Sequence, residues 1–145
     1  SRSTDGKVTF RDVADAAGLA SGAFGMSAST GDVNRDGQVD LHLGAMWSSA
    51  GHRITTQENF RGGGLDSAMR DRFRHLARGN SLFLNTSAKS AGQTLDVSFA
   101  DASTTSGVTL GRWSWASVFG DMDNDTWPDL LVANGFVTGE RPDDL

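Results

Sequence analysis

Two nine-residue stretches, DVNRDGQVD at residues 32–40 and DMDNDTWPD at residues 121–129, place oxygen-bearing side chains at the same positions. In both stretches, positions 1, 3, 5 and 9 are Asp or Asn. A tightly wound loop with this spacing turns successive oxygens toward one point. Calcium takes six to eight oxygen ligands at roughly 2.3–2.6 Å, and the backbone carbonyl at position 7 is the usual further ligand in such loops. The spacing therefore predicts two calcium-binding loops.

The two stretches lie at equivalent places of a longer internal repeat. Shifting the chain by 89 residues aligns residues 8–46 with residues 97–135 without a gap, and ten of the 39 pairs are identical. The identities fall on glycines, loop aspartates and apolar positions, which backbone geometry, metal ligation and burial would fix. We interpret residues 8–46 and 97–135 as two structural repeats within one domain spanning residues 1–145.

The rest of the sequence has the texture of an all-β protein. Short β-type runs recur between glycine or Asx turns, and 18 residues are Gly. The expected strands are 8–13, 25–30, 39–46, 81–85, 95–100, 113–119 and 129–133. In both repeats the acidic stretch joins two strands, so its ninth residue begins a buried strand.

Residues 54–79, between the repeats, form a predicted helical insertion. Asp66 can cap a helix over residues 67–78, which ends at Gly79. Its apolar stripe is Leu65, Met69, Phe73 and Leu76, and its other faces carry Arg70, Arg72, Arg74 and Arg78. We interpret this segment as a solvated helix that packs its stripe on the sheet; an anion or partner site is the alternative.

Composition excludes several functional classes. The chain has no Cys and no run of eighteen apolar residues, so neither a disulfide framework nor a membrane span is expected. Seven of the 18 acidic residues lie in the two stretches, and two bound Ca²⁺ would bring the formal net charge from −5 to −1. Nothing in the sequence suggests a nucleic-acid-binding surface, which needs a clustered basic face. We interpret the start at residues 1–4 as a cut end.

Three other interpretations explain single features of the sequence. An EF-hand needs an acidic ligand at position 12, where this chain has Leu43 and Val132. An enzyme needs a convergent catalytic set, but none surrounds the three histidines, and His42 is expected to be a surface or interstrand residue. Trp113 and Trp115 could stack on a glycan, but their repeat partners, Phe24 and Met26, favour a core stripe that packs between neighbouring sheets.

The motifs resemble those of a known family. The stretch from Gly31 through Leu41, together with FRDVADAAGL at residues 10–19, resembles the FG-GAP/VCBS repeats that build calcium-binding β-propeller blades. GNSLFLN at residues 79–85 and the stretch 113–135 look like the bacterial branch that often precedes an ASPIC/UnbV-type domain. The resemblance covers roughly residues 7–140 and implies an all-β, partial β-propeller of about one full blade plus part-blades, with a helical insertion.

The resemblance also implies the ligands of two Ca²⁺ sites. By position they are Asp32, Asn34, Asp36, the Gln38 carbonyl and Asp40 in one, and Asp121, Asp123, Asp125, the Trp127 carbonyl and Asp129 in the other. The sharp-turn glycine is present as Gly37, but its counterpart is Thr126, which tolerates a positive φ poorly. The second loop is therefore expected either to turn differently or to be strained.

The resemblance implies a non-catalytic, calcium-stabilised scaffold that is secreted, periplasmic or at the cell surface. Its expected partners are the remaining blades of a larger propeller or neighbouring subunits, together with protein or glycan ligands. The alternative is a non-catalytic part of a larger propeller-containing enzyme.

Overall fold

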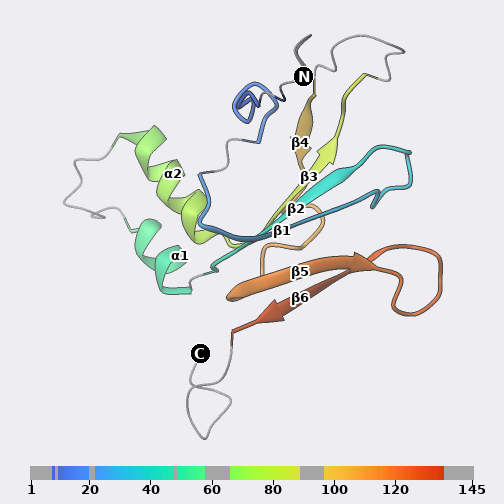
Figure 1. The fold of residues 1–145 in the computed structure, drawn as a ribbon. Coiled ribbons are helices and arrows are strands. Elements are labelled where there is room, and N and C mark those ends of the chain that lie inside the picture. The colour runs from blue at the N-terminus through green and yellow to red at the C-terminus, as the bar shows by residue number, and fades with distance from the viewer. Residues whose placement is uncertain are drawn as a thin grey trace, which may run out of the picture.

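The computed structural model is mostly β. It describes residues 8, 10–19, 22–47, 49–57, 66–88 and 97–135, with the backbone alone for residues 49 and 50. Within this part of the chain, six strands form two antiparallel sheets, and two helices follow the second strand (Figure 1). The fold is thus compatible with the predicted all-β class. Neither sheet is closed within the described residues.

The larger sheet is a four-stranded meander in the order β1-β2-β3-β4. Its strands are β1 (Gly25–Gly31), β2 (Asp40–Ala45), β3 (Ser81–Asn85) and β4 (Phe99–Asp101). From Asp40 to Gly44 in β2, buried and partly exposed residues alternate, as expected from the period of two in a strand. The smaller sheet is a hairpin of β5 (Ser114–Gly120) and β6 (Asp129–Asn134).

The β1–β2 and β5–β6 hairpins have the same register at a shift of 89 residues. The corresponding pairs are Gly31–Asp40 with Gly120–Asp129 beside the acidic loops, and Gly25–Ala45 with Ser114–Asn134 at the far ends. Both hairpins also have an irregularity one residue after the start of their first strand. As expected, β2 and β6 begin at the ninth residue of each acidic stretch, but the expected burial holds only for β2, since most residues of β6 are exposed.

The helical segment contains α1 (Ser49–Thr55) and α2 (Ser67–Ala77). The Asp66 cap is confirmed, because its Oδ1 accepts a hydrogen bond of 2.7 Å from the Met69 N–H. Gly79 follows the helix with a φ of 93°. Helix α1 was not predicted, and Leu65, the first residue of the predicted apolar stripe, lies outside the described residues.

Arg78 fixes the end of α2 to the sheet. Its Nη1 donates to Asp101 Oδ2 at 2.8 Å, and its Nη2 donates to Ser81 Oγ at 2.9 Å. Partial burial alone raises the pKa of Asp101, but hydrogen bonds from Ser103 and Arg78 outweigh this effect and hold the pKa below its ordinary value. The sequence predicted a solvated arginine at this position, but Arg78 forms a structural ion pair instead.

The predicted strand at residues 8–13 is wrong for residues 10–13, which are not in a strand. The Asp12 carboxylate accepts a hydrogen bond from the Ala14 N–H at 2.9 Å and starts a turn instead. The predicted strand at 95–100 is shortened to β4, because Ser87 Oγ, rather than a neighbouring strand, pairs with the Ser98 N–H at 3.0 Å. Residues 95 and 96 lie outside the described part.

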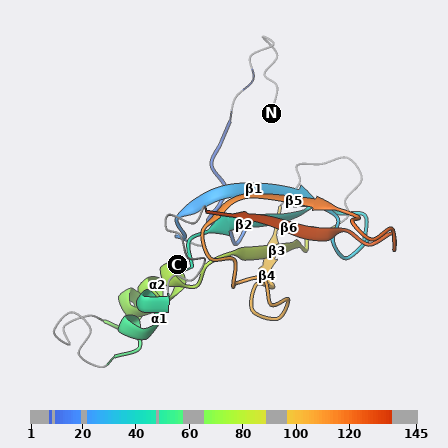
Figure 2. The ribbon, with the colours of Figure 1, turned by 90° about the horizontal axis from the view of Figure 1, so that it is seen from below.

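The two sheets pack with β5 next to β1 and β2 (Figures 1 and 2). The contact face is polar: Ser117 Oγ lies 3.2 Å from Ser27 Oγ, 3.1 Å from Ser29 Oγ and 3.0 Å from His42 Nδ1. Phe119 packs edge-on against His42 with ring centroids 6.1 Å apart. The apolar core is small, comprising Ala17, Ala45, Ala77, Leu82 and Phe83 among the described residues.

Candidate metal centre

The first loop, residues 32–40, is wound around its own carboxylates. The carboxylate at position 1 accepts hydrogen bonds from the backbone N–H groups of positions 5 and 6. The carboxylate at position 5 accepts one from the N–H of position 7, and the carboxylate at position 9 accepts one from the N–H of position 2. The bonds are Asp36 N to Asp32 at 3.0 Å, Gly37 N to Asp32 at 2.9 Å, Gln38 N to Asp36 at 2.8 Å and Val33 N to Asp40 at 2.9 Å.

The second loop, residues 121–129, makes the same bonds at the same positions. They are Asp125 N to Asp121 at 3.1 Å, Thr126 N to Asp121 at 2.9 Å, Trp127 N to Asp125 at 2.7 Å and Met122 N to Asp129 at 2.9 Å. Position 3 also accepts from position 5 in both loops, through Asn34 and Asp123. Two different sequences therefore adopt one loop conformation.

The backbone angles agree as well. Position 4 is left-handed in both loops, with φ of 59° at Arg35 and 62° at Asn124. Position 6 has φ of 82° at Gly37 and 74° at Thr126. Of the two outcomes expected for Thr126, the structure shows the second, because the loop makes the same turn with a β-branched residue in an unfavourable region.

Three carboxylates of the second loop converge. Oxygens of Asp121, Asp123 and Asp129 lie within 4.8 Å of one another, and all three residues are exposed. Two oxygens that each lie about 2.4 Å from one ion can be at most about 4.8 Å apart, so the spacing of these atoms meets the distance limit for sharing one cation. The donor set consists only of oxygens, as a hard cation prefers.

Not every predicted ligand belongs to a group of converging carboxylates. Asp125 is not one of the converging carboxylates, and its Oδ1 accepts from Trp127 N. In the first loop, the described aspartates do not converge in this way, and the amide of Asn34 occupies position 3, with its Nδ2 donating to Asp36 Oδ2 at 3.1 Å. A carboxylate oxygen that accepts one hydrogen bond still has a lone pair for a cation, so these contacts leave ligation open.

The first loop is held by β3. The Asn85 N–H donates to Asp40 Oδ1 at 2.8 Å, Asn85 Nδ2 donates to the Val39 carbonyl at 3.1 Å, and Gln38 Nε2 donates to the Asn85 carbonyl at 3.3 Å. Asp40 is completely buried, whereas its counterpart Asp129 is exposed. No comparable contact from a third strand to the second loop is present among the described residues.

The two loops contact each other at the same end of the sheets (Figure 1). Arg35 Nη1 donates to Thr126 Oγ1 at 3.1 Å, and the Arg35 guanidinium carbon lies 5.0 Å from the centroid of the Trp127 ring. Sequence reasoning missed this role of Arg35, because no sequence pattern indicates contacts between residues about 90 positions apart.

The contact between His42 and Ser117 has the composition of a catalytic dyad but not its accessibility. His42 is completely buried, so the surface alternative is wrong and the interstrand one is correct. Burial lowers the pKa of His42 to about 4, which leaves the ring neutral near pH 7. Its Nε2 has no partner among the described residues. Because the buried His42 ring is inaccessible to a substrate, we assign this contact a structural role.

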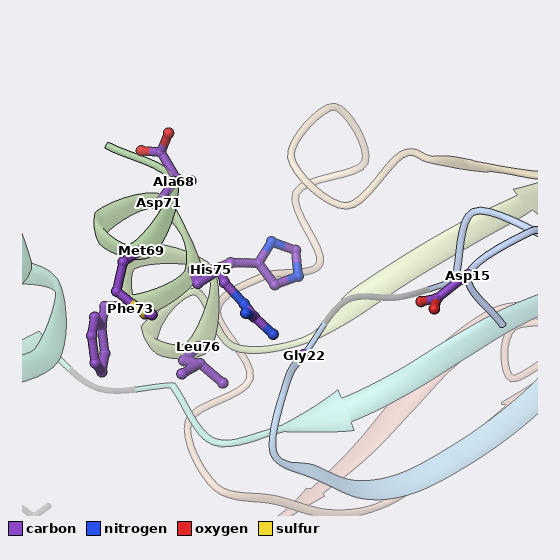
Figure 3. Close-up of a pocket in the computed structure, with 9 residues that line it drawn as sticks. Asp15, Gly22, Ala68, Met69, Asp71, Phe73, His75 and Leu76 are labelled. Atoms are coloured by element: carbon purple, nitrogen blue, oxygen red, sulfur yellow. The ribbon is translucent and has the colours of Figure 1, made fainter. Parts of the chain in front are cut away.

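A hollow of about 650 Å³ lies beside α2 and has a mixed lining: Asp15, Gly22, Ala68, Met69, Asp71, Arg72, Phe73, His75 and Leu76. Figure 3 shows Asp15 across the hollow from the helix side chains. Burial, and then the charge of Arg78, lower the pKa of His75, while Asp101 opposes the change. Among the described residues of this lining, no nucleophile lies in hydrogen-bond contact with a base.

The aromatic residues expected in a core stripe are exposed. Trp113 and Trp115 have 45% and 51% of their surfaces accessible, and their ring centroids are 6.3 Å apart. Phe24 is 66% exposed. Within this chain, therefore, these side chains are not core residues.

Comparison with known proteins gives no significant match to a family model, a curated protein or a solved structure. Within the described residues, no helix has the length and apolar character needed to cross a membrane.

Proposed function

We propose that this chain is part of a calcium-stabilised β-propeller of the FG-GAP/VCBS type, acting as a non-catalytic scaffold for protein or glycan contact. The observation that carries the proposal is the shared geometry of the two acidic loops, each with the same hydrogen bonds and left-handed positions. Two unrelated surface turns would have no reason to agree in this detail. The shared aspartates make these bonds, and we infer that both loops carry them for a common ligand.

The packing of the hairpins supports the propeller. The face of β1–β2 that carries Ser29 and His42 is covered by β5. At the 89-residue shift these residues correspond to Val118 and Leu131, which are 50% and 53% exposed. The β5–β6 hairpin thus has an uncovered apolar face where β1–β2 has a covered polar one. A further sheet, packed as β5 packs on β1 and β2, would cover it.

The exposed position of the second loop fits a protein outside the cytoplasm. Extracellular calcium modules bind with dissociation constants of roughly 10⁻⁴–10⁻³ M, which an open site with several carboxylates can provide. We therefore propose a secreted, periplasmic or cell-surface setting. The helices and the exposed tryptophans are the surfaces available for partner contact.

Isothermal titration calorimetry of the full chain with CaCl₂ tests the proposal. We expect two bound ions per chain, one fewer in the variant Asp121→Asn/Asp123→Asn, and an unchanged number in the matched surface variant Asp66→Asn/Asp71→Asn. The control removes the same charge from α2, away from both loops. Absence of calcium binding by the folded wild-type chain would refute the proposal.

A further inference from the structure

The contact between the acidic loops joins one loop that is well anchored to one that is not. Asn85 holds the first loop through hydrogen bonds to Asp40 and the Val39 carbonyl. The second loop is exposed along its length up to Trp127, and Arg35 reaches it from the first loop. The side chain of Arg35 thus links the conformation of the second loop to that of the first.

The position of Arg35 within the first loop makes this contact sensitive to a cation bound by that loop. Arg35 lies between Asn34 and Asp36, two of the proposed ligands, and has a left-handed φ of 59°. A non-glycine residue keeps this conformation only where its surroundings hold it. An ion bound by positions 3 and 5 would fix the backbone on both sides of Arg35 and hence the direction of its side chain.

We propose that Arg35 couples the two calcium sites, so that calcium in the first loop raises the calcium affinity of the second. This inference rests on the sites proposed above. The guanidinium contacts Thr126 and Trp127, positions 6 and 7 of the second loop, and the position 7 carbonyl is a proposed ligand. Ordering these two residues before the ion arrives lowers the entropy lost on binding.

The expected size of the coupling follows from the kind of contact. A cation–π contact at an exposed site corresponds to roughly a twofold to fivefold change in an equilibrium constant. The coupling is reciprocal, so filling the second loop must raise the affinity of the first by the same factor. Lysine keeps the charge of Arg35 but lacks the planar fork that stacks and donates at the same time.

Amide NMR titration of the full chain with CaCl₂ gives a separate signal for each loop, from Gly37 in the first and Thr126 in the second. A double-mutant cycle then compares Asp32→Asn, which disables the first loop, in the wild-type and Arg35→Lys backgrounds. We expect Asp32→Asn to raise the half-saturating calcium concentration at Thr126 by about twofold to fivefold in the wild type. In the Arg35→Lys background we expect Asp32→Asn to leave this concentration almost unchanged.

Two further variants separate the contact from general charge effects. Trp127→Leu removes the stacking surface while leaving Arg35 in place, and we expect it to abolish the coupling as Arg35→Lys does. The matched control Arg72→Lys makes the same substitution on α2, and we expect it to keep the wild-type coupling. An equal effect of Asp32→Asn in the wild-type and Arg35→Lys backgrounds would overturn the inference while leaving the calcium sites intact. If neither amide responds to calcium, the proposed function fails and the inference fails with it.

Discussion

Thr126 adopts a φ of 74° at the loop position where Gly37 has a φ of 82°. A non-glycine residue in a sparsely populated backbone region costs of order 1–3 kcal/mol, whereas glycine adopts this conformation freely. The second loop therefore reaches the geometry of the first at a cost in stability. The cost persists because the Asp121 carboxylate holds the Thr126 N–H at 2.9 Å.

Replacing Thr126 by glycine should stabilise the folded protein. We expect Thr126→Gly to raise the free energy of unfolding by about 1 kcal/mol, since the relief of strain exceeds the loss of the exposed hydrogen bond from Arg35. Urea denaturation in the presence of a chelator measures this change. The reverse substitution, Gly37→Thr, should destabilise by about 1–3 kcal/mol. A less stable Thr126→Gly variant would show that the backbone at this position is not strained.

Calcium should stabilise the fold, because the loops contain three and four carboxylates, and the three that converge in the second loop repel one another without a cation. Binding to the native state alone adds about 2.7 kcal/mol per site at a hundredfold excess over the dissociation constant. We expect chelation to lower the melting temperature and magnesium to restore it poorly, because Mg²⁺ prefers a smaller octahedral site. Calorimetric melting curves that coincide with calcium and with chelator would contradict this expectation.

Stability should fall between about pH 6.5 and pH 4 because of His42. The folded-state pKa of His42 is lowered to about 4, so in this interval the unfolded chain binds a proton that the folded chain does not. The contribution of His42 is complete above the unfolded pKa and is lost as the pH falls toward 4. The loss amounts to about 2–3 kcal/mol.

Unfolding free energies measured at several pH values, with calcium absent, test this prediction. The variant His42→Leu, which introduces the residue found at the equivalent position 131, should flatten the dependence. His75→Gln is the control: burial and Arg78 lower the pKa of His75 in the same direction, but its ring is only partly buried. A steep dependence that survives His42→Leu would assign the effect to another group.

The uncovered face of β5–β6 should make the isolated chain associate. Val118 and Leu131 are about half exposed, and the larger set of exposed apolar and aromatic residues includes Phe10, Phe24, Trp113 and Trp115. We expect oligomers or aggregates in light scattering, and binding of a dye that reports apolar surface. Val118→Ser/Leu131→Ser should reduce both signals, whereas Ile54→Ser, on α1, should not. A monomeric, dye-silent wild-type chain would remove the support for the propeller.

The sequence predicted the parts of the fold that local rules determine. The spacing of Asp121, Asp123 and Asp129 predicts a loop that directs oxygens inward, and their carboxylate oxygens do lie close together. The Asp66 cap and the helix it starts follow from side-chain bonding to the nearest turn. These features depend on residues a few positions apart, so they can be predicted from the sequence.

The remaining features depend on contacts across the fold. The buried state of His42 arises because Ser117, 75 residues away, packs over it. Residues 10–13 have strand-like composition, but Asp12 bonds to the Ala14 N–H and forms a turn. The Arg35–Trp127 contact depends on how the two hairpins pack. Periodicity and spacing along one segment contain no information about such partners.

A crystal structure of the chain grown with calcium tests the central claim most directly. The account predicts one ion in each loop, beside Asp32, Asp36 and Asp40 in the first and beside Asp121, Asp123 and Asp129 in the second. Each ion should have six to eight oxygen ligands at roughly 2.3–2.6 Å, including the carbonyls of Gln38 and Trp127. Well-ordered loops without an ion at millimolar calcium would contradict the account.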